Sequence, residues 1–333
     1  MSIFLLSFDD KRLTQAQVAE IKEHVPSGLD FVHTDDKNAI KEMASEIEVI
    51  AGEVRPKGLL DMPNLKWAQQ WGAGANWLMR YPELVKRPFT LTNVAGIHAI
   101  PISEHILGML LHFGRNFANA VAAQKEHTWA NIKRPTDSYE HIPFAFSTKN
   151  LFELADKTML VIGVGAIGER TAKLAKAFDM HVIGIRHNPD KASPYVDQMV
   201  SSAQLLDVLP LADFVVLTAP LTKATRHMIG EQAFAAMKAS AFLSNIGRGE
   251  LVDETYLLPA LQNETIAGAA LDVFEQEPLP QDSPFWALDN LFITSHYSGA
   301  NPRYNERALT ILLDNMARYG QQQPLRNVVD KEL

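Results

Sequence analysis

A glycine-rich segment with the sequence GVGAIG, residues 163–168, constrains the fold of this chain more than any other feature. It follows an apolar run at residues 159–162 and precedes a helical pattern at residues 169–178. Gly163 permits a sharp turn, Gly165 lets a ligand approach the backbone, and Gly168 lets helix and strand pack closely. We therefore predict a strand–turn–helix unit that presents the amino end of its helix to an anionic group.

The rest of the chain alternates short apolar runs with helical patterns, which is typical of doubly wound α/β folds. At 333 residues it is long enough for two domains. The last helical pattern, residues 302–319, has no strand left to join in the second sheet, so we expect it to return to the first domain. The predicted strands are residues 2–7, 30–32, 49–51, 67–70, 90–93, 158–162, 181–185, 214–217, 241–244, 266–269 and 291–294.

Composition excludes several classes of protein. The chain has no cysteine, which excludes disulfides, thiolate metal sites and a cysteine nucleophile. Its net charge is −8 and it has no basic run, so we expect no nucleic-acid or membrane partner. Its amino-terminal apolar run ends in acidic residues and no run has membrane-spanning length, so we expect no signal peptide and a cytoplasmic protein. The histidines form no H-E-x-x-H motif, and we expect no metal site.

The strand after the glycine motif indicates which dinucleotide binds. An NAD-binding unit normally carries an acidic residue about 20 residues past the first glycine, where it accepts from the ribose 2′-hydroxyl. This chain has Arg186 and His187 there instead. A guanidinium pairs with a 2′-phosphate that a carboxylate would repel. The alternative is an ordinary surface arginine, but we expect NADP(H) to be preferred, with NAD(H) as a second cofactor.

Three later segments place charged side chains where predicted strands end. Arg248 follows the strand at 241–244, Glu277 follows the strand at 266–269, and His296 follows the strand at 291–294. Ligands of open parallel sheets bind at the carboxyl ends of the strands, so these three side chains are expected to meet. Each alone could be a salt bridge, a loop acid or a packed histidine.

With these motifs in order, the chain resembles the D-isomer-specific 2-hydroxyacid dehydrogenase family over essentially its whole length. The similar segments are the glycine motif, the three strand ends, and residues 72–76, 93–96, 103–105, 219–225 and 324–329. The resemblance implies a Rossmann-type cofactor domain, residues 101–296, inserted in a flavodoxin-like substrate domain, residues 1–100 and 297–333. His98 and Ser295 depart from the family pattern and leave the detailed shape of the pocket open.

The resemblance also implies roles for the three strand-end residues in reducing a 2-keto acid to a D-2-hydroxy acid. Arg248 would bind the keto acid's carboxylate and carbonyl. His296 would act as acid/base, with Glu277 favouring its protonated form and orienting the ring. The expected substrate-binding residues are Ala73, Gly74, Arg248, His296 and Tyr297. The expected cofactor-binding residues are Gly163, Gly165, Ala166, Ile167, Gly168, Arg186, His187, Ala219, Pro220, Thr225, Ile246, Gly247, Arg248, Asp272, His296 and Ser298.

A long helical pattern, residues 102–127, and the irregular segment that follows it resemble the family's dimerisation arm, near residues 102–150. We therefore expect a homodimer, with Trp129 reaching the neighbour's active site. The active cleft is expected between the domains. Candidates to line the substrate pocket are Trp71, Asn76, His98 and Tyr297, each of which could equally be packed in a core.

Three alternatives differ in what they predict. A formate or phosphite dehydrogenase would share the family fold, although the formate-oxidising relatives carry glutamine where this chain has Glu277. A nucleotide-sensing corepressor would bind the dinucleotide without physiological turnover. Asp272, at another strand end, is the alternative partner for His296. The preferred keto acid and the physiological direction stay open.

Overall fold

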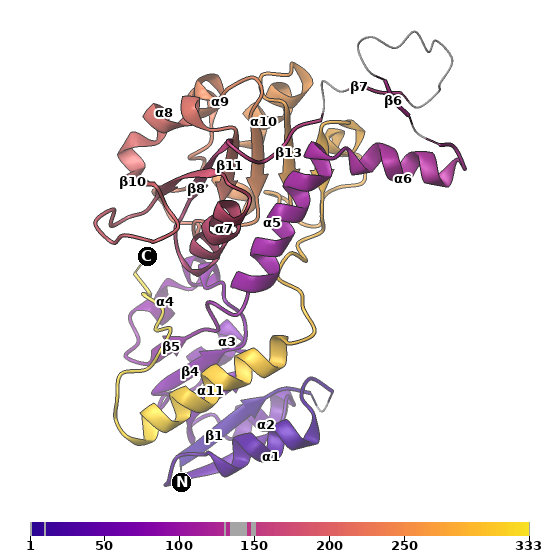
Figure 1. Ribbon diagram of the computed structural model, residues 1–333. Helices are drawn as coiled ribbons and strands as arrows, with labels where there is room; N and C mark the ends of the chain where they lie inside the picture. Colours follow the sequence, from indigo (N-terminus) through magenta and orange to yellow (C-terminus); the bar gives the residue numbers. More distant parts are fainter. Residues whose placement is uncertain (1, 10, 130, 134–144, 148–150, 333) are drawn as a thin grey trace. The chain divides into compact units, whose positions relative to one another are not determined.

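The chain divides into two compact units in a computed structural model that describes residues 2–9, 11–129, 131–133, 145–147 and 151–332 (Figure 1). Unit 1 comprises Met1–Ile97 and Asn301–Leu333, and unit 2 comprises His98–Ala300. The division therefore falls at residues 97 and 300, where the sequence indicated 100 and 296.

Unit 1 is built on a five-stranded parallel sheet in the order β2-β1-β3-β4-β5. This order is the flavodoxin-like one that the fold prediction named. Its strands are β1 (Ser2–Ser7), β2 (Leu29–His33), β3 (Ile47–Gly52), β4 (Trp67–Gln70) and β5 (Thr90–Thr92).

Helices cover both faces of this sheet, which explains why its strands are apolar on both sides. Phe4 of β1 lies with Trp67 of β4 in the core cluster on one face. Leu5, the next residue of β1, lies with Leu91 of β5 in the cluster on the other face. The first cluster includes Leu312 of the last helix, so the C-terminal segment belongs to unit 1. The helices are α1 (Gln15–Glu23), α2 (Lys37–Glu42), α3 (Pro56–Leu60), α4 (Pro82–Val85) and α11 (Tyr304–Gly320), with the 3-10 helix η1 (Asn76–Arg80).

Unit 2 is built on a seven-stranded parallel sheet in the order β10-β9-β8-β11-β12-β13-β14. The strand order reverses between β8 and β11, as in a Rossmann fold. The sequence indicated only six of these strands, because β10 (Gln198–Val200) is short and begins with an exposed polar residue. The others are β8 (Thr158–Ile162), β9 (His181–Ile185), β11 (Phe214–Leu217), β12 (Phe242–Asn245), β13 (Gly268–Leu271) and β14 (Leu291–Ile293).

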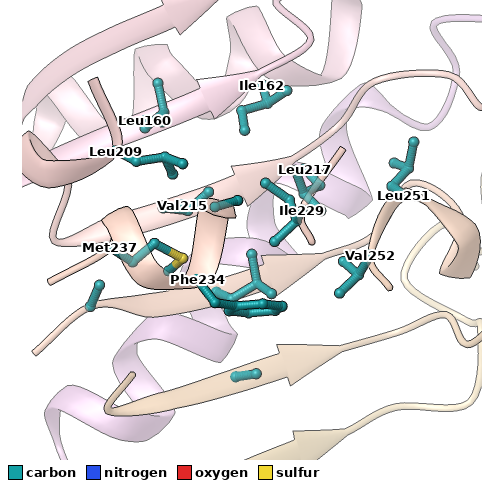
Figure 2. Packing of buried hydrophobic residues seen from close by; sticks show 14 of the residues in the cluster. Leu160, Ile162, Leu209, Val215, Leu217, Ile229, Phe234, Met237, Leu251 and Val252 are labelled. Carbon is teal, nitrogen blue, oxygen red and sulfur yellow. The ribbon is translucent and has the colours of Figure 1, made fainter. Parts of the chain in front are cut away.

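Successive residues of these strands again enter opposite cores. Figure 2 shows Leu160, Val215 and Leu217 in one cluster. This cluster also contains Phe234 of α9 and Met237, which follows that helix. Met159, Val161 and Val216 instead join the cluster under α5 and α7. The helices of this unit are α5 (Ala99–Gly114), α6 (Phe117–Lys125), α7 (Ala166–Ala177), α8 (Leu205–Val208), α9 (Glu231–Ala236) and α10 (Glu254–Gln262), with η3 (Ser202–Gln204), η4 (Leu209–Leu211), η5 (Gly249–Leu251) and η6 (Pro284–Ala287).

The prediction of one long helix at residues 102–127 is wrong. The structure has two helices, α5 and α6, that meet at a bend (Figure 1). Asn116 adopts φ 52°, a left-handed conformation that ends a helix and that asparagine tolerates better than most residues. The apolar spacing continues through this residue, so periodicity alone does not reveal the break.

Much of the irregular segment predicted at residues 130–150 lies outside the described residues. Two short strands there, β6 (Asn131–Lys133) and β7 (Ala145–Ser147), pair in parallel. Among the helices that the structure describes, none has the length and apolar character needed to cross a bilayer.

Candidate active site

The glycine motif forms the predicted turn between β8 and α7, and two of its glycines are required by the fold. Gly163 has φ +101°, and a Cβ there would lie 2.5 Å from the Ala219 backbone nitrogen. A Cβ on Gly168 would lie 2.4 Å from the Gly163 carbonyl oxygen. Thr218 Oγ1 donates to that same oxygen at 2.7 Å. Side chains at these two positions would separate the turn from the neighbouring strand end.

Gly165 is different, because a Cβ there would meet no protein atom within 4 Å. No side chain caps α7, whose first residues are Ala166 and Ile167. In the described part of the chain, the backbone N–H groups of Ala166, Ile167 and Gly168 donate to no acceptor. Open space and unpaired N–H groups at a helix amino end suit an anion such as a pyrophosphate. The residues present therefore fit a dinucleotide.

Arg186 lies at the end of β9, the strand adjacent to the glycine turn. Its Nη1 donates to the Lys191 carbonyl oxygen at 2.9 Å. None of the ion pairs found among the described residues involves this guanidinium, and His187 beside it is exposed. The positive charge expected for a 2′-phosphate is therefore present without a competing carboxylate.

His296 and Glu277 form the pair that the sequence predicted. The His296 Nδ1 atom lies 2.6 Å from Glu277 Oε2, and the two side chains are 50% and 34% exposed. A carboxylate only accepts, so Nδ1 carries the proton and donates to it. This leaves Nε2 as the ring nitrogen that can exchange a proton with a ligand. The other Glu277 oxygen, Oε1, accepts from the Phe274 backbone N–H at 3.0 Å, which holds the carboxylate in place.

Asp272 is not the partner of the His296 ring. It is 1% exposed, and its carboxylate accepts from Thr294 Oγ1 at 2.5 Å and from the backbone N–H groups of Tyr297 and Ser298 at 3.1 and 3.0 Å. Burial alone would raise the pKa of Asp272, but the hydrogen bonds from Ser298, Thr294 and Tyr297 outweigh it and lower that pKa. Asp272 is thus an ionised group that anchors the turn bearing His296.

His105 of α5 contacts Thr294 and Tyr297, two residues that donate hydrogen bonds to Asp272, and the sequence did not reveal this contact. Its Nε2 lies 3.1 Å from Thr294 Oγ1, and its ring meets the Tyr297 ring edge to face at 5.6 Å. Because the Thr294 hydroxyl donates to Asp272, it accepts from His105 Nε2–H. Burial lowers the pKa of His105, and the nearby Asp272 opposes this only in part. A neutral ring therefore supports the turn from the side of α5.

Arg248 is the N-cap residue of η5, three residues after the end of β12. In the described part of the chain its guanidinium takes part in no ion pair, and Nη1 donates to the Gly247 carbonyl oxygen at 2.6 Å. A Cβ on the next residue, Gly249, would lie 1.9 Å from the Phe274 carbonyl carbon. The backbones of the Arg248 loop and the Glu277 loop are therefore in direct contact, and only glycine permits this.

A second link between these loops is a cluster of His227, Asp253 and Glu275, whose nearest ligand atoms all lie within 4.8 Å of one another. His227 Nε2 lies 3.0 Å from Glu275 Oε1, and Nδ1 lies 3.7 Å from Asp253 Oδ2. The imidazole thus faces a carboxylate with each nitrogen, which suits a hydrogen-bonded bridge between loops. The sequence singled out none of these three residues, because they follow three different strands.

The other predicted cofactor residues of unit 2 line the same carboxyl edge of the sheet. Ala219 and Ile246 are buried directly after β11 and β12, and Thr225 Oγ1 donates to the Pro220 carbonyl oxygen at 2.7 Å. Gly247 N–H donates to Asn245 Oδ1 at 3.0 Å. Beside the histidine–glutamate pair lies a cavity of about 470 Å³, lined by Asp272, Phe274, Glu277, Trp286, Ile293 and His296.

The predicted substrate residues Ala73 and Gly74 lie in unit 1, in the loop between β4 and η1. Of the candidates to line the substrate pocket, Trp71 is only 3% exposed and packs edge to face on Phe8. It is therefore a core residue, which was the alternative interpretation. Tyr297 is 54% exposed beside His296. His98 Nδ1 lies 3.2 Å from the Gly299 carbonyl oxygen. The Asn76 side chain lies outside the described residues.

Comparison with known proteins identifies the family. Residues 107–298 match the model of the D-isomer specific 2-hydroxyacid dehydrogenase, NAD binding domain. The chain belongs to the D-isomer-specific 2-hydroxyacid dehydrogenase family. It is thus an oxidoreductase that uses a nicotinamide dinucleotide, as the glycine motif and the strand-end residues predicted.

Relatives of this dehydrogenase include both solved structures and longer chains. A family protein from Aeromonas salmonicida superposes with a TM-score of 0.81 at 29% identity, covering 99% of each chain. An NADPH-dependent glyoxylate/hydroxypyruvate reductase from Sinorhizobium meliloti, in complex with NADP and sulfate, gives 0.79 at 25%, covering 100% of this chain and 99% of that one. A D-3-phosphoglycerate dehydrogenase from Methanocaldococcus jannaschii is 35% identical over 72% of this chain, which spans 43% of that protein.

Proposed function

We propose that this dehydrogenase reduces a 2-keto acid to the D-2-hydroxy acid with NADPH, and that His296, Glu277 and Arg248 carry the chemistry. The contact of 2.6 Å between His296 Nδ1 and Glu277 Oε2 carries the proposal. It supplies an acid whose second nitrogen is available at the carboxyl edge of an NAD-binding sheet. The reductase of Sinorhizobium meliloti, named for glyoxylate and hydroxypyruvate, supports small keto acids as the first substrates to test.

Each of the three residues has a separate task. Arg248 pairs its planar guanidinium with the substrate's carboxylate and polarises the adjacent carbonyl. The guanidinium is available for this, because no carboxylate of the described residues forms an ion pair with it. His296 donates the Nε2 proton to the carbonyl oxygen as negative charge develops there. Glu277 stabilises the imidazolium and fixes the ring so that Nε2 faces outward. Bound NADPH supplies the hydride that reduces the carbonyl carbon.

The remaining site residues are proposed from their positions. The N–H groups of Ala166, Ile167 and Gly168 bind the pyrophosphate, and Gly165 leaves room for it. Ala73 and Gly74 bind the substrate carboxylate through their backbone. The rest of the predicted set contacts the cofactor or lies beside it, namely Gly163, Arg186, His187, Ala219, Pro220, Thr225, Ile246, Gly247, Asp272, Tyr297 and Ser298.

A panel of keto acids tests the proposed reaction. Oxidation of NADPH and of NADH would be followed at the reduced-cofactor absorbance band with glyoxylate, hydroxypyruvate, pyruvate and phenylpyruvate. We expect turnover on at least one of them at about 1–10³ per second, the ordinary range for enzymes. Dinucleotide binding without turnover on any of them would contradict the proposal and favour the nucleotide-sensing alternative.

We propose that Arg186 makes NADPH the preferred cofactor. Replacing it with aspartate places a carboxylate where the 2′-phosphate binds, and removes a charge-assisted hydrogen bond. Arg186→Asp should lower the ratio of kcat/KM for NADPH over that for NADH by about 10–100-fold. Because both constants come from one variant, general damage to the enzyme cancels in the ratio. An unchanged ratio would show that Arg186 does not select the cofactor.

We propose a homodimer that forms through α6 and the segment after it. Phe117 and Val121 lie one turn apart on α6 and are 49% and 50% exposed, and Trp129 beyond it is 85% exposed. An apolar surface of this kind is typical of a protein interface. Light scattering on the purified protein would give the mass of two chains, and a single-chain mass would refute the dimer.

A further inference from the structure

In the loop between β4 and η1, the carbonyl oxygens of Gly72, Ala73 and Gly74 are hydrogen-bonded to described residues of the protein, and their N–H groups are not. The oxygen of Gly72 accepts from Val94 N–H at 3.4 Å and from Gln70 Nε2 at 2.9 Å. The oxygen of Ala73 accepts from Asn93 Nδ2 at 2.8 Å, and that of Gly74 from Gln70 Nε2 at 2.7 Å. Within the described residues, the N–H groups of Gly72, Ala73 and Gly74 donate to nothing.

Gln70 is the residue that sets this orientation. It is the last residue of β4, and its side chain is buried, with the residue only 6% exposed. Trp77 Nε1 donates to Gln70 Oε1 at 2.9 Å. An indole N–H is only a donor, so this contact places the amide oxygen on the Trp77 side and turns the NH₂ group toward the loop. Both amide hydrogens are then used, one on the Gly72 oxygen and one on the Gly74 oxygen.

We infer that Gln70 is a positioning residue for the substrate, which keeps the Gly72–Ala73–Gly74 N–H groups free to bind its carboxylate. Neighbouring backbone N–H groups whose carbonyl oxygens are all engaged elsewhere form a concave site for an anion. The side chain acts only through this loop and touches no reacting atom. The inference rests on the proposed function, because it assumes an anionic keto acid.

The chemistry of this position is specific to an amide. A carboxylate at Gln70 would keep the shape but direct its oxygens at the two carbonyl oxygens, which repel it. An apolar side chain would leave those oxygens and the Trp77 indole without partners. Either change allows the peptides of the loop to rotate and withdraw N–H groups from the substrate.

Gln70→Glu and Asn93→Asp test the inference in the full-length enzyme. Asn93→Asp removes the donor to the Ala73 oxygen but retains Oδ1, which accepts from Ala95 N–H at 2.9 Å. In each variant we expect KM for the keto acid and the inhibition constant of oxalate to rise about tenfold. We expect kcat and KM for NADPH to change less than threefold. Gln17→Glu is the control, because its Oε1 accepts from Thr14 N–H at 3.0 Å and a carboxylate preserves that bond.

The outcomes separate this inference from the proposed function. If Gln70→Glu does not fold, KM for the keto acid and oxalate inhibition are measured on Asn93→Asp alone, and this variant then tests the inference. Unchanged KM and oxalate inhibition in a folded variant, or an equal loss in kcat and NADPH affinity, would overturn the positioning role while the reaction stands. If the unaltered enzyme reduces no keto acid, the proposed reaction fails, and calorimetric titration of oxalate into the NADP-bound protein still tests the loop. Oxalate binding weakened about tenfold by either variant would then support it, and unchanged binding would refute it.

Discussion

Replacing His296 with alanine is expected to lower kcat for keto-acid reduction by about 10²–10⁴-fold, the usual contribution of a general acid. The variant loses the imidazole whose Nδ1 is held at 2.6 Å by Glu277 and whose Nε2 is available to a ligand. The dissociation constant of NADPH should stay within about threefold, because the side chain is half exposed and supports no core packing. Stopped-flow absorbance gives the rate, and quenching of tryptophan fluorescence gives cofactor affinity.

His181 provides a matched control for this variant. Its side chain is also 50% exposed, and its Nδ1 lies 3.3 Å from a carboxylate, that of Asp197. It begins β9, at the opposite end of the strand from Arg186. His181→Ala should therefore leave kcat and cofactor affinity unchanged. If His296→Ala retained most of the rate, another group would be the acid.

Replacing Gly249 with alanine is expected to cause the largest loss of stability of any single change considered. The new Cβ would lie 1.9 Å from the Phe274 carbonyl carbon and 2.3 Å from the Glu275 nitrogen, and both are backbone atoms that no side-chain rotation can move. The two loops must separate, which carries Arg248 away from Glu277. We expect a loss of about 4 kcal/mol or more in the free energy of unfolding. Urea unfolding followed by circular dichroism measures it.

Gly165→Ala is the contrasting variant, because a Cβ there meets no protein atom within 4 Å. Its free energy of unfolding should change by less than about 0.5 kcal/mol, as for other substitutions without contacts. Its KM for NADPH should nevertheless rise about tenfold or more, since the methyl group fills space that the pyrophosphate needs. Equal destabilisation in both variants, or tight NADPH binding by Gly165→Ala, would contradict this division of the glycines.

Much of the fold followed from local patterns. The first five strands and six of the seven strands from β8 onward lie close to their predicted positions, because short apolar runs indicate buried strands. The prediction failed where local signals were weak. Strand β10 is three residues long, and the break at Asn116 depends on one left-handed residue inside a continuous apolar pattern.

The candidate site shows the same division. The glycine motif, Arg186, Arg248, Glu277 and His296 could be named from the sequence, because each stands beside a strand end whose place in the sheet is known. The roles of His105, His227 and Gln70 could not. Their partners are Thr294, Glu275 and the carbonyl oxygens of the Gly72–Gly74 loop, and nothing in the spacing of residues along the chain indicates these pairs.

The sequence by itself determined most of the strands and helices, the glycine turn between β8 and α7, and the chemical types of the candidate catalytic side chains. These properties depend on residues that are neighbours along the chain. Only the tertiary structure decided that the Asp272 carboxylate anchors the turn through Thr294, Tyr297 and Ser298, and that Gly249 joins two loops by backbone contact. Such contacts form between loops that follow different strands, so they exist only once the sheet has assembled.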